Sequence, residues 1–321
     1  MDLLKLIKTK AKLFDGTSSE RGVDAIIHHI EISESHYELG KSNGEHLYTD
    51  VIYRTNQAFE GALKEAFRVL TGSDPSKKSP HEIEKHFESN KLLKERVLAQ
   101  FATYRTDWRN KSTHDYQLFF SSQEALLAIV SVSAFFNILL DQITEKRSFD
   151  LEKEKVLRRA KGFFGDGNVY GSMGFMQQII ELLKLFSDEL REEGAIDISV
   201  KEYELLGRLA GFISAADPDI VISTEQAINY GSRRLMMDML LKKGDGSVIL
   251  ELKRPSVEFT RRAREGMEQL KHYLVASNIS QGIVYAPALT KQVEKDYRES
   301  FIDVPTGELK IATLTPAMLI E

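Results

Sequence analysis

From Leu235 to Pro255 the chain reads Leu-Met-Met-Asp238-Met-Leu-Leu-Lys-Lys-Gly-Asp-Gly-Ser-Val-Ile-Leu-Glu251-Leu-Lys253-Arg-Pro. Two short apolar runs rich in strand-forming residues flank Gly-Asp-Gly, which predicts a β-hairpin. Asp238 then lies on the first strand, and Glu251 and Lys253 lie on the second. Because side chains alternate along a strand, Glu251 and Lys253 share one face of the predicted sheet.

Charged groups inside an apolar strand lose hydration, so their burial requires compensation. A divalent cation bound by Asp238 and Glu251, with Lys253 facing a phosphate group or a water molecule, would provide it. The alternative is a network of surface ion pairs at the edge of a sheet. The hairpin therefore predicts either a metal site or a structural ion-pair cluster.

A predicted helix from about Val257 to Ala276 follows the hairpin and carries Gln269 and Tyr273, which share a face because they are four residues apart. Asp238, the Glu251-Leu-Lys253 step and Gln269-x-x-x-Tyr273 together resemble the PD-(D/E)XK, restriction-endonuclease-like nucleases of the RecB-type branch. The resemblance covers roughly residues 195–321. It departs from the family pattern at Met237, where the family name has proline, so Asp219 of Pro218-Asp219 is kept as a second candidate for the first acid.

The resemblance implies a nuclease that uses Mg²⁺ or Mn²⁺ bound by Asp238 and Glu251. In that family an acidic residue on the first helix often helps to bind metal, and the implied residue here is Glu204, with Glu202 as the alternative. Lys253 would act on the attacking water, and Gln269 and Tyr273 would position the nucleic acid or the lysine. Phosphate groups on either side would be contacted by four basic residues, Arg261, Arg262, Arg264 and Lys271.

Composition restricts the class of protein. The 321 residues are enough for two domains, and the net charge of −5 confines nucleic-acid binding to local basic patches. The chain has no cysteine, which excludes disulfides and thiolate metal sites and fits a reducing compartment. We expect a cytoplasmic protein without a signal peptide or a membrane span.

The apolar periodicity predicts an α+β, multidomain protein. Residues 1–160 are expected to form an all-α bundle, with a loop near Ser33–Gly44, a helix opening at Ser79-Pro80 and a buried central helix over Gln123–Leu140. Residues 161–194 form a glycine-rich linker and a helix, and residues 195–321 form an α/β domain with a mixed sheet. Besides the hairpin, strands are expected at Pro218–Ser223, Gln281–Tyr285 and, at the sheet edge, Leu309–Leu314.

A second motif lies between two predicted helices of the first half. Arg109-Asn110-x-x-x-His114 in an all-α context resembles the HEPN family, over roughly residues 20–145. That resemblance implies a homodimer and a metal-independent ribonuclease site, in which arginine contacts phosphate, histidine transfers a proton and Asn110 orients the imidazole. The structural alternative is that Arg109 caps a helix or pairs with Asp115 and that His114 is a packed core residue.

Together the two resemblances imply a two-domain nuclease with nucleic acid as its partner. Such pairings occur in bacterial anti-phage defence proteins, which suggests a dimer or higher oligomer and a further defence-system protein as a partner. Two alternatives remain: a nucleic-acid- or ligand-sensing regulatory subunit whose HEPN half is inactive, and an interaction subunit without any activity.

Overall fold

The structure is a computed structural model, and it divides the chain into two compact units, Met1–Lys146 and Arg147–Glu321. The division falls inside one 38-residue helix, earlier than the predicted boundary at residue 160. The structure describes residues 2–109, 119–159, 168–193, 200–256, 258–288, 295–304 and 307–316.

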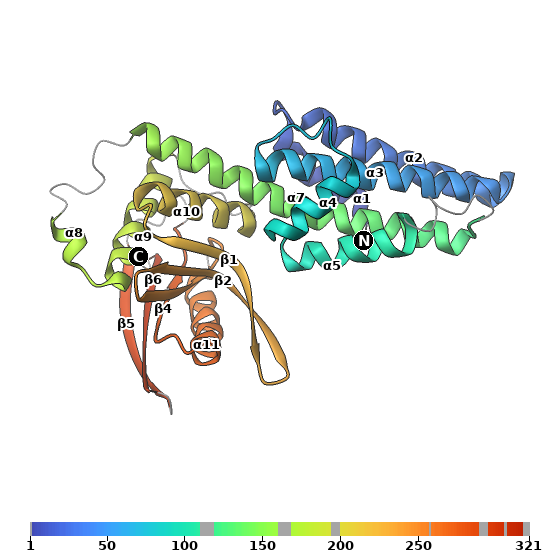
Figure 1. The fold of residues 1–321 in the computed structure, drawn as a ribbon. Helices are drawn as coiled ribbons and strands as arrows, with labels where there is room; N and C mark the ends of the chain where they lie inside the picture. Colours follow the sequence, from blue (N-terminus) through green and yellow to red (C-terminus); the bar gives the residue numbers. More distant parts are fainter. Residues whose placement is uncertain are drawn as a thin grey trace. The chain divides into compact units, whose positions relative to one another are not determined.

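The N-terminal unit is helical, as predicted. It is built around two long antiparallel helices, α2 (Glu20–Asn43) and α3 (His46–Thr71), which lie side by side (Figure 1). A left-handed residue, Gly72, ends the second of them, and a capping box between Ser79 and Glu82 begins the next helix, as expected at Ser79-Pro80. The elements are α1 (Leu3–Ala11), η1 (Lys12–Phe14), α2 (Glu20–Asn43), α3 (His46–Thr71), α4 (Pro80–Asn90), α5 (Glu95–Tyr104), the π-helical turn η2 (Arg105–Arg109) and the first part of α7 (Ser122–Arg159).

The loop expected near Ser33–Gly44 is wrong, because α2 continues to Asn43. The polar residues that suggested a loop are accommodated on the helix. Ser33, for example, is buried and donates a hydrogen bond to the Ile30 carbonyl at 2.7 Å. Gly40 lies within this helix and allows Tyr48 to pack closely, because a Cβ atom at Gly40 would lie 2.6 Å from the Tyr48 ring. The chain turns only at Gly44, which has a φ of +121°.

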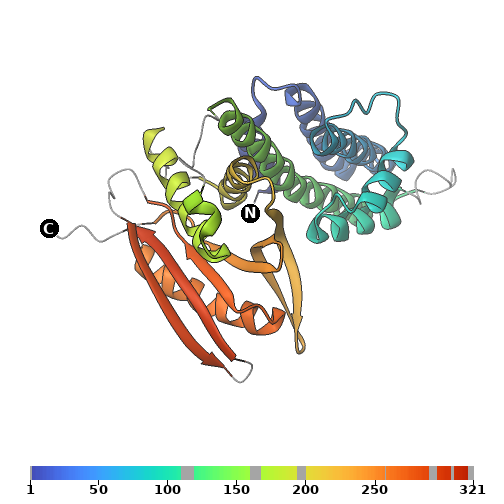
Figure 2. The ribbon, with the colours of Figure 1, turned by 60° about the vertical axis from the view of Figure 1, so that its left-hand side comes forward.

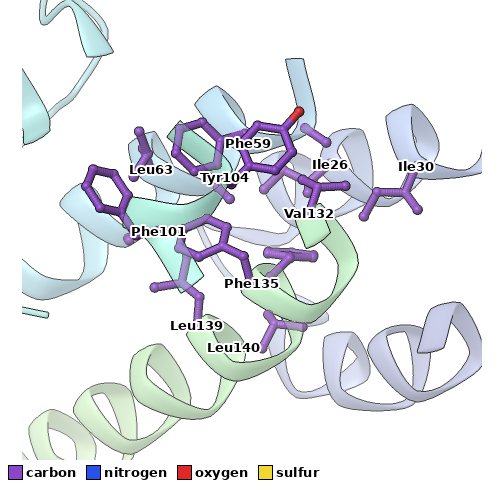
Figure 3. Packing of buried hydrophobic residues seen from close by; sticks show 14 of the residues in the cluster. Ile26, Ile30, Phe59, Leu63, Phe101, Tyr104, Val132, Phe135, Leu139 and Leu140 are labelled. Atoms are coloured by element: carbon purple, nitrogen blue, oxygen red, sulfur yellow. The ribbon is translucent and has the colours of Figure 1, made fainter. Parts of the chain in front are cut away.

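Aromatic and aliphatic side chains fill the centre of the helical unit (Figure 3). Phe59 of α3 stacks on Tyr104 with ring centroids 4.6 Å apart and packs on Phe135 of α7 at 5.1 Å. The central helix is buried on one side only, since Leu127 remains 54% exposed. In the described part of the chain, α7 alone is long and apolar enough to cross a membrane, and 61% of its most apolar window is buried inside the protein.

The C-terminal unit has a six-stranded mixed sheet with the order β1-β2-β3-β4-β6-β5, which confirms the α+β class and the mixed sheet. One face of the sheet packs against α11, and the other packs against α9 and α10 (Figure 2). The elements are α8 (Asn168–Ser172), α9 (Phe175–Glu192), α10 (Glu202–Ala216), β1 (Val221–Tyr230), β2 (Arg233–Lys243), β3 (Gly246–Leu252), α11 (Phe259–Ser277), β4 (Gln281–Tyr285), β5 (Lys295–Val304) and β6 (Gly307–Pro316).

The sheet edge differs from the prediction. The strand expected at Leu309–Leu314 exists as β6, but it lies inside the sheet, parallel to β4 on one side and antiparallel to β5 on the other. The edge is β5, whose sequence Lys-Asp-Tyr-Arg-Glu-Ser-Phe-Ile-Asp-Val is rich in charges, as edge strands commonly are. Because β5 has so many charged residues, the apolar periodicity did not predict a strand there.

Candidate active site on the beta2-beta3 hairpin

The predicted hairpin is present and brings the two acids together. β2 and β3 pair antiparallel from Lys243↔Gly246 to Met239↔Leu250, around a turn in which Gly244 has a φ of +54°. One further step in this register sets Asp238 opposite Glu251. Asp238 Oδ2 accepts a hydrogen bond from the Leu252 backbone N–H at 2.8 Å, so the first acid is fixed to the strand that carries the second.

Lys253 links the hairpin to the helix that follows it. Its ammonium Nζ donates to Glu251 Oε1 and to Gln269 Oε1, each at 2.6 Å. Its backbone N–H donates to the Tyr285 carbonyl of β4 at 2.7 Å, so the lysine is held although β3 has ended. Asp238, Glu251, Lys253 and Gln269, which are widely separated in the sequence, therefore meet at one place.

Gly266 explains how α11 approaches so closely, and the sequence analysis missed it. A Cβ atom at this position would lie 2.8 Å from Lys253 Cε and 3.1 Å from Val284 Cγ1. The helix backbone thus rests directly over the Lys253 side chain. The available signal was a glycine inside a helical pattern, three residues before Gln269 and seven before Tyr273, on the face that both share.

The electrostatics of the acid pair are unusual. Burial, followed by the charge of Glu251, raises the pKa of Asp238 to about 8, although the Leu252 N–H acts in the opposite direction. Burial also raises the pKa of Glu251, and Lys253 lowers it. Glu251 is only 3% exposed, and its buried Oε2 atom has no hydrogen-bond partner within the described part of the chain. Two buried carboxyl groups beside one ammonium group leave room for a further positive charge or a proton.

The carboxylate oxygens of Asp238 and Glu251 suit a hard cation such as Mg²⁺, but two acids provide few ligands. Glu202, the first residue of α10, has a charge that raises the pKa of both Asp238 and Glu251, whereas Glu204 is not among the main influences on either. The arrangement thus favours the alternative, Glu202, over Glu204. Among the residues that the structure describes, no three His, Cys, Asp or Glu side chains are grouped closely enough to hold a metal ion.

Tyr273 lies on the same helix and is 8% exposed. Burial, followed by the charges of Glu251 and Asp238, raises its pKa, so the phenol stays protonated. The spare acid, Asp219, is placed elsewhere: its backbone N–H donates to Asp217 Oδ1 before β1 begins. The structure therefore favours Asp238 as the first acid of the group.

The four basic residues predicted to contact phosphate differ in their surroundings. Arg261 pairs with Glu258 at 2.5 Å and lies 3.9 Å from Glu265, and Lys271 pairs with Glu268 at 2.6 Å. Arg262 and Arg264 form no ion pair with any residue in the described part of the chain. Arg262 is half-buried and lies one turn before Gly266, on the helix face that reaches Lys253.

The second predicted site is described only at Arg109. This residue ends η2, and its guanidinium group lies 3.8 Å from Glu60 and 3.7 Å from Glu84. Two acidic groups therefore occupy the surroundings in which a phosphate was expected. Trp108 beside it is packed into the helical core. Asn110 and His114 lie outside the described residues.

Comparison of the chain with models of known families, with curated proteins and with solved structures returned no match.

Proposed function

We propose that the C-terminal unit is a metal-dependent nuclease that hydrolyses phosphodiester bonds at Asp238, Glu251 and Lys253. One observation carries the proposal: two buried acids face each other across adjacent strands, and a lysine joins one of them to Gln269 of the next helix. This order of strand, turn, strand and helix is the one that the resemblance to PD-(D/E)XK nucleases implies. A purely structural cluster would not need an excess of buried negative charge.

Each group has a defined role in this proposal. Asp238 and Glu251, with the Leu252 carbonyl, would hold a Mg²⁺ or Mn²⁺ ion, which when bound acidifies water and stabilises charge on phosphate, and the nearby charge of Glu202 would favour the cation. Lys253 orients the attacking water and offsets phosphate charge. Gln269 accepts a hydrogen bond from the ammonium group and so keeps it in place. Arg262, which has no acidic partner in the described part of the chain, contacts a flanking phosphate.

The test is a cleavage panel with labelled single- and double-stranded DNA and RNA, with Mg²⁺ or with EDTA. We expect the wild-type chain to cut at least one substrate with Mg²⁺ and Lys253→Ala to lose at least about a hundredfold in rate, because its charge acts at the reacting phosphate. Lys242→Ala is the matched control, since Lys242 lies exposed on the same hairpin.

Two results would contradict the assignment of a nuclease site to Asp238, Glu251 and Lys253. One is equal cleavage by the wild-type chain and Lys253→Ala, and the other is no cleavage of any substrate with Mg²⁺ or, in a repeat of the panel, with Mn²⁺. Thermal unfolding of each variant separates a chemical role from a loss of folding.

We infer a regulatory role for the helical unit as a second candidate function, because Arg109 lies between Glu60 and Glu84. An arginine held by two acids is a poor phosphate ligand until it is released. The helical unit would then dimerise and sense nucleic acid or a ligand, while only the C-terminal unit cuts. RNA cleavage that persists in EDTA and disappears in His114→Ala would instead establish a second active site.

A role in bacterial anti-phage defence, in the cytoplasm and with a further defence protein as partner, completes the proposal by analogy with proteins that pair such units. It is tested by phage plating on cells that express the wild-type chain or Lys253→Ala. Equal plating on both would remove this role without affecting the nuclease assignment.

A further inference from the structure

A hollow lies along the seam between α2 and α3 in the helical unit. Its volume is about 440 Å³, within the size range of sites for small organic ligands. A second hollow of about 270 Å³ shares two of its lining residues and also includes Glu60, the acid beside Arg109. The larger hollow is lined by His29, His36, Asp50, Tyr53, Arg54 and Gln57.

Arg54 is the main indication that the hollow binds a ligand. It is half-buried, yet within the described ranges it forms no hydrogen bond or ion pair. Asp50 lies one turn earlier on α3 and lines the same hollow without pairing with it. A guanidinium group is always charged and presents five N–H donors, so Arg54, which does not pair with Asp50, has donors left for an anion that enters the hollow.

The histidines add donors to the same space. The Nδ1 atoms of His29 and His36 are buried and have no hydrogen-bond partner among the residues that the structure describes, so each ring has hydrogen-bonding capacity left for a ligand. Burial, with the charges of Arg54 and His28, lowers the pKa of His29. His29 is therefore neutral near pH 7, and Arg54 rather than His29 provides positive charge at the hollow.

Tyr53 provides a flat apolar surface at the rim. Its side chain is 54% exposed although it lines the hollow. In proteins that bind single-stranded nucleic acids, exposed aromatic rings beside cationic groups stack on nucleobases. This stacking adds to the binding free energy with little dependence on which base is present. Asp50 and Gln57 supply acceptors for sugar or base hydroxyl and amino groups.

We propose that the α2–α3 hollow binds a phosphate-bearing nucleotide, either free or within an RNA chain. Arg54 holds the phosphate, Tyr53 stacks on the base and Asp50 accepts a hydrogen bond from the sugar. The site lies in the unit without the acid pair and requires no metal, so it is independent of the nuclease assignment.

The experiment measures binding to the full chain in EDTA, with three probes: inorganic phosphate, adenosine 5′-monophosphate and a short fluorescein-labelled oligoribonucleotide. We expect Arg54→Gln to weaken nucleotide or oligonucleotide binding at least about tenfold. Arg21→Gln should change it by less than about twofold, because Arg21 is an exposed arginine of α2 outside the hollow. Tyr53→Ala should weaken binding, and Tyr53→Phe should preserve it.

The probes also distinguish the two sources of the ligand. Tight binding of the monophosphate supports a free nucleotide, and binding of the oligoribonucleotide alone supports RNA. Three results overturn the proposal: no probe binds at millimolar concentration, Arg54→Gln binds like the wild-type chain, or phosphate binds as tightly as the nucleotide. Thermal unfolding checks that each variant is folded, and the exposed Tyr53 offers a test that does not depend on Arg54.

Discussion

Glu84 of the helical unit and Glu251 of the C-terminal unit are equally buried, each 3% exposed, but their surroundings are opposite. Glu84 lies between two cations, 3.6 Å from Arg105 and 3.7 Å from Arg109, and these arginines also contact the more exposed Glu88 and Glu60. Glu251 has one cation, Lys253, and faces a second acid, Asp238. Each glutamate also has one buried oxygen that finds no hydrogen-bond partner among the described residues.

The difference shows that burial of a charged group does not by itself mark a functional site. A buried acid that contacts a cation on each side can be purely structural, because both cations stabilise its charge. A buried acid beside another acid remains in need of positive charge, and such pairs are found where protons or metal ions are handled. The contrast between Glu84 and Glu251 can be tested in four ways.

The largest effect should come from Glu251→Gln. We expect Mg²⁺-dependent cleavage to fall at least about a hundredfold, because the amide retains the shape of the side chain but cannot bind a cation as a carboxylate does. The measurement is the cleavage rate on the substrate identified with the wild-type chain. Glu258→Gln, at an exposed residue that pairs with Arg261, is the control and should cleave normally.

The same substitution should affect stability differently at the two glutamates. Glu84→Gln should lower the free energy of unfolding by about 1–2 kcal/mol, a value reduced because both arginines are partly exposed. Glu251→Gln should lower it less, because the lost ion pair with Lys253 is offset by the removal of a buried negative charge next to Asp238. Urea denaturation measures both, and the comparison fails if Glu251→Gln is the more destabilising of the two.

Stability should depend on pH through Asp238. Its folded-state pKa of about 8 is above the unfolded value, so the folded chain binds more protons between the two values. This contribution is fully present below about pH 4 and is lost as the pH rises towards 8. The slope is at most about 1.4 kcal/mol per pH unit.

Urea denaturation between pH 5 and pH 8, chosen as roughly the window below that pKa, measures this slope. Asp238→Asn should reduce it, and Mg²⁺ should restore stability at the upper end. Burial also raises the pKa of Glu65 in the helical unit, so the difference between variant and wild type is the relevant quantity. An unchanged slope in Asp238→Asn would show that the pair does not share a proton.

The smallest effect should appear on α11. Arg262→Gln should weaken nucleic-acid binding about threefold to tenfold and reduce the salt dependence of binding by about one phosphate contact. Arg261→Gln is matched in chemistry and neighbouring in sequence, but Arg261 already pairs with Glu258 and should matter little. Equal effects of the two variants would mean that ion pairing within the helix does not determine which arginine contacts phosphate.

Local chemistry made part of the molecule predictable. The Gly-Asp-Gly turn, the alternation around Glu251 and the capping box at Ser79 are short-range features, and the structure confirms the hairpin and the helix start. The four-residue spacing of Gln269 and Tyr273 likewise predicted a shared face, and the structure brings Gln269 to Lys253 and Tyr273 near the acids.

Long-range packing set the limits of prediction. The polar residues of α2 suggested a loop, but packing against α3 keeps the helix continuous to Asn43. The order of β6 and β5 depends on pairing between distant segments, which no local pattern encodes. Glu202 and Glu204 look alike in sequence, and only the placement of α10 distinguishes their influence on the acid pair.

Gly266 also offers a practical tool for work on this protein. Because the backbone of α11 rests on the Lys253 side chain, a single added methyl group at 266 would displace the ammonium group without altering any ionisable residue. Gly266→Ala would leave the cation ligands chemically intact while misaligning the group that acts on water. Such a chain would be suited to capturing a complex with uncut substrate for structure determination.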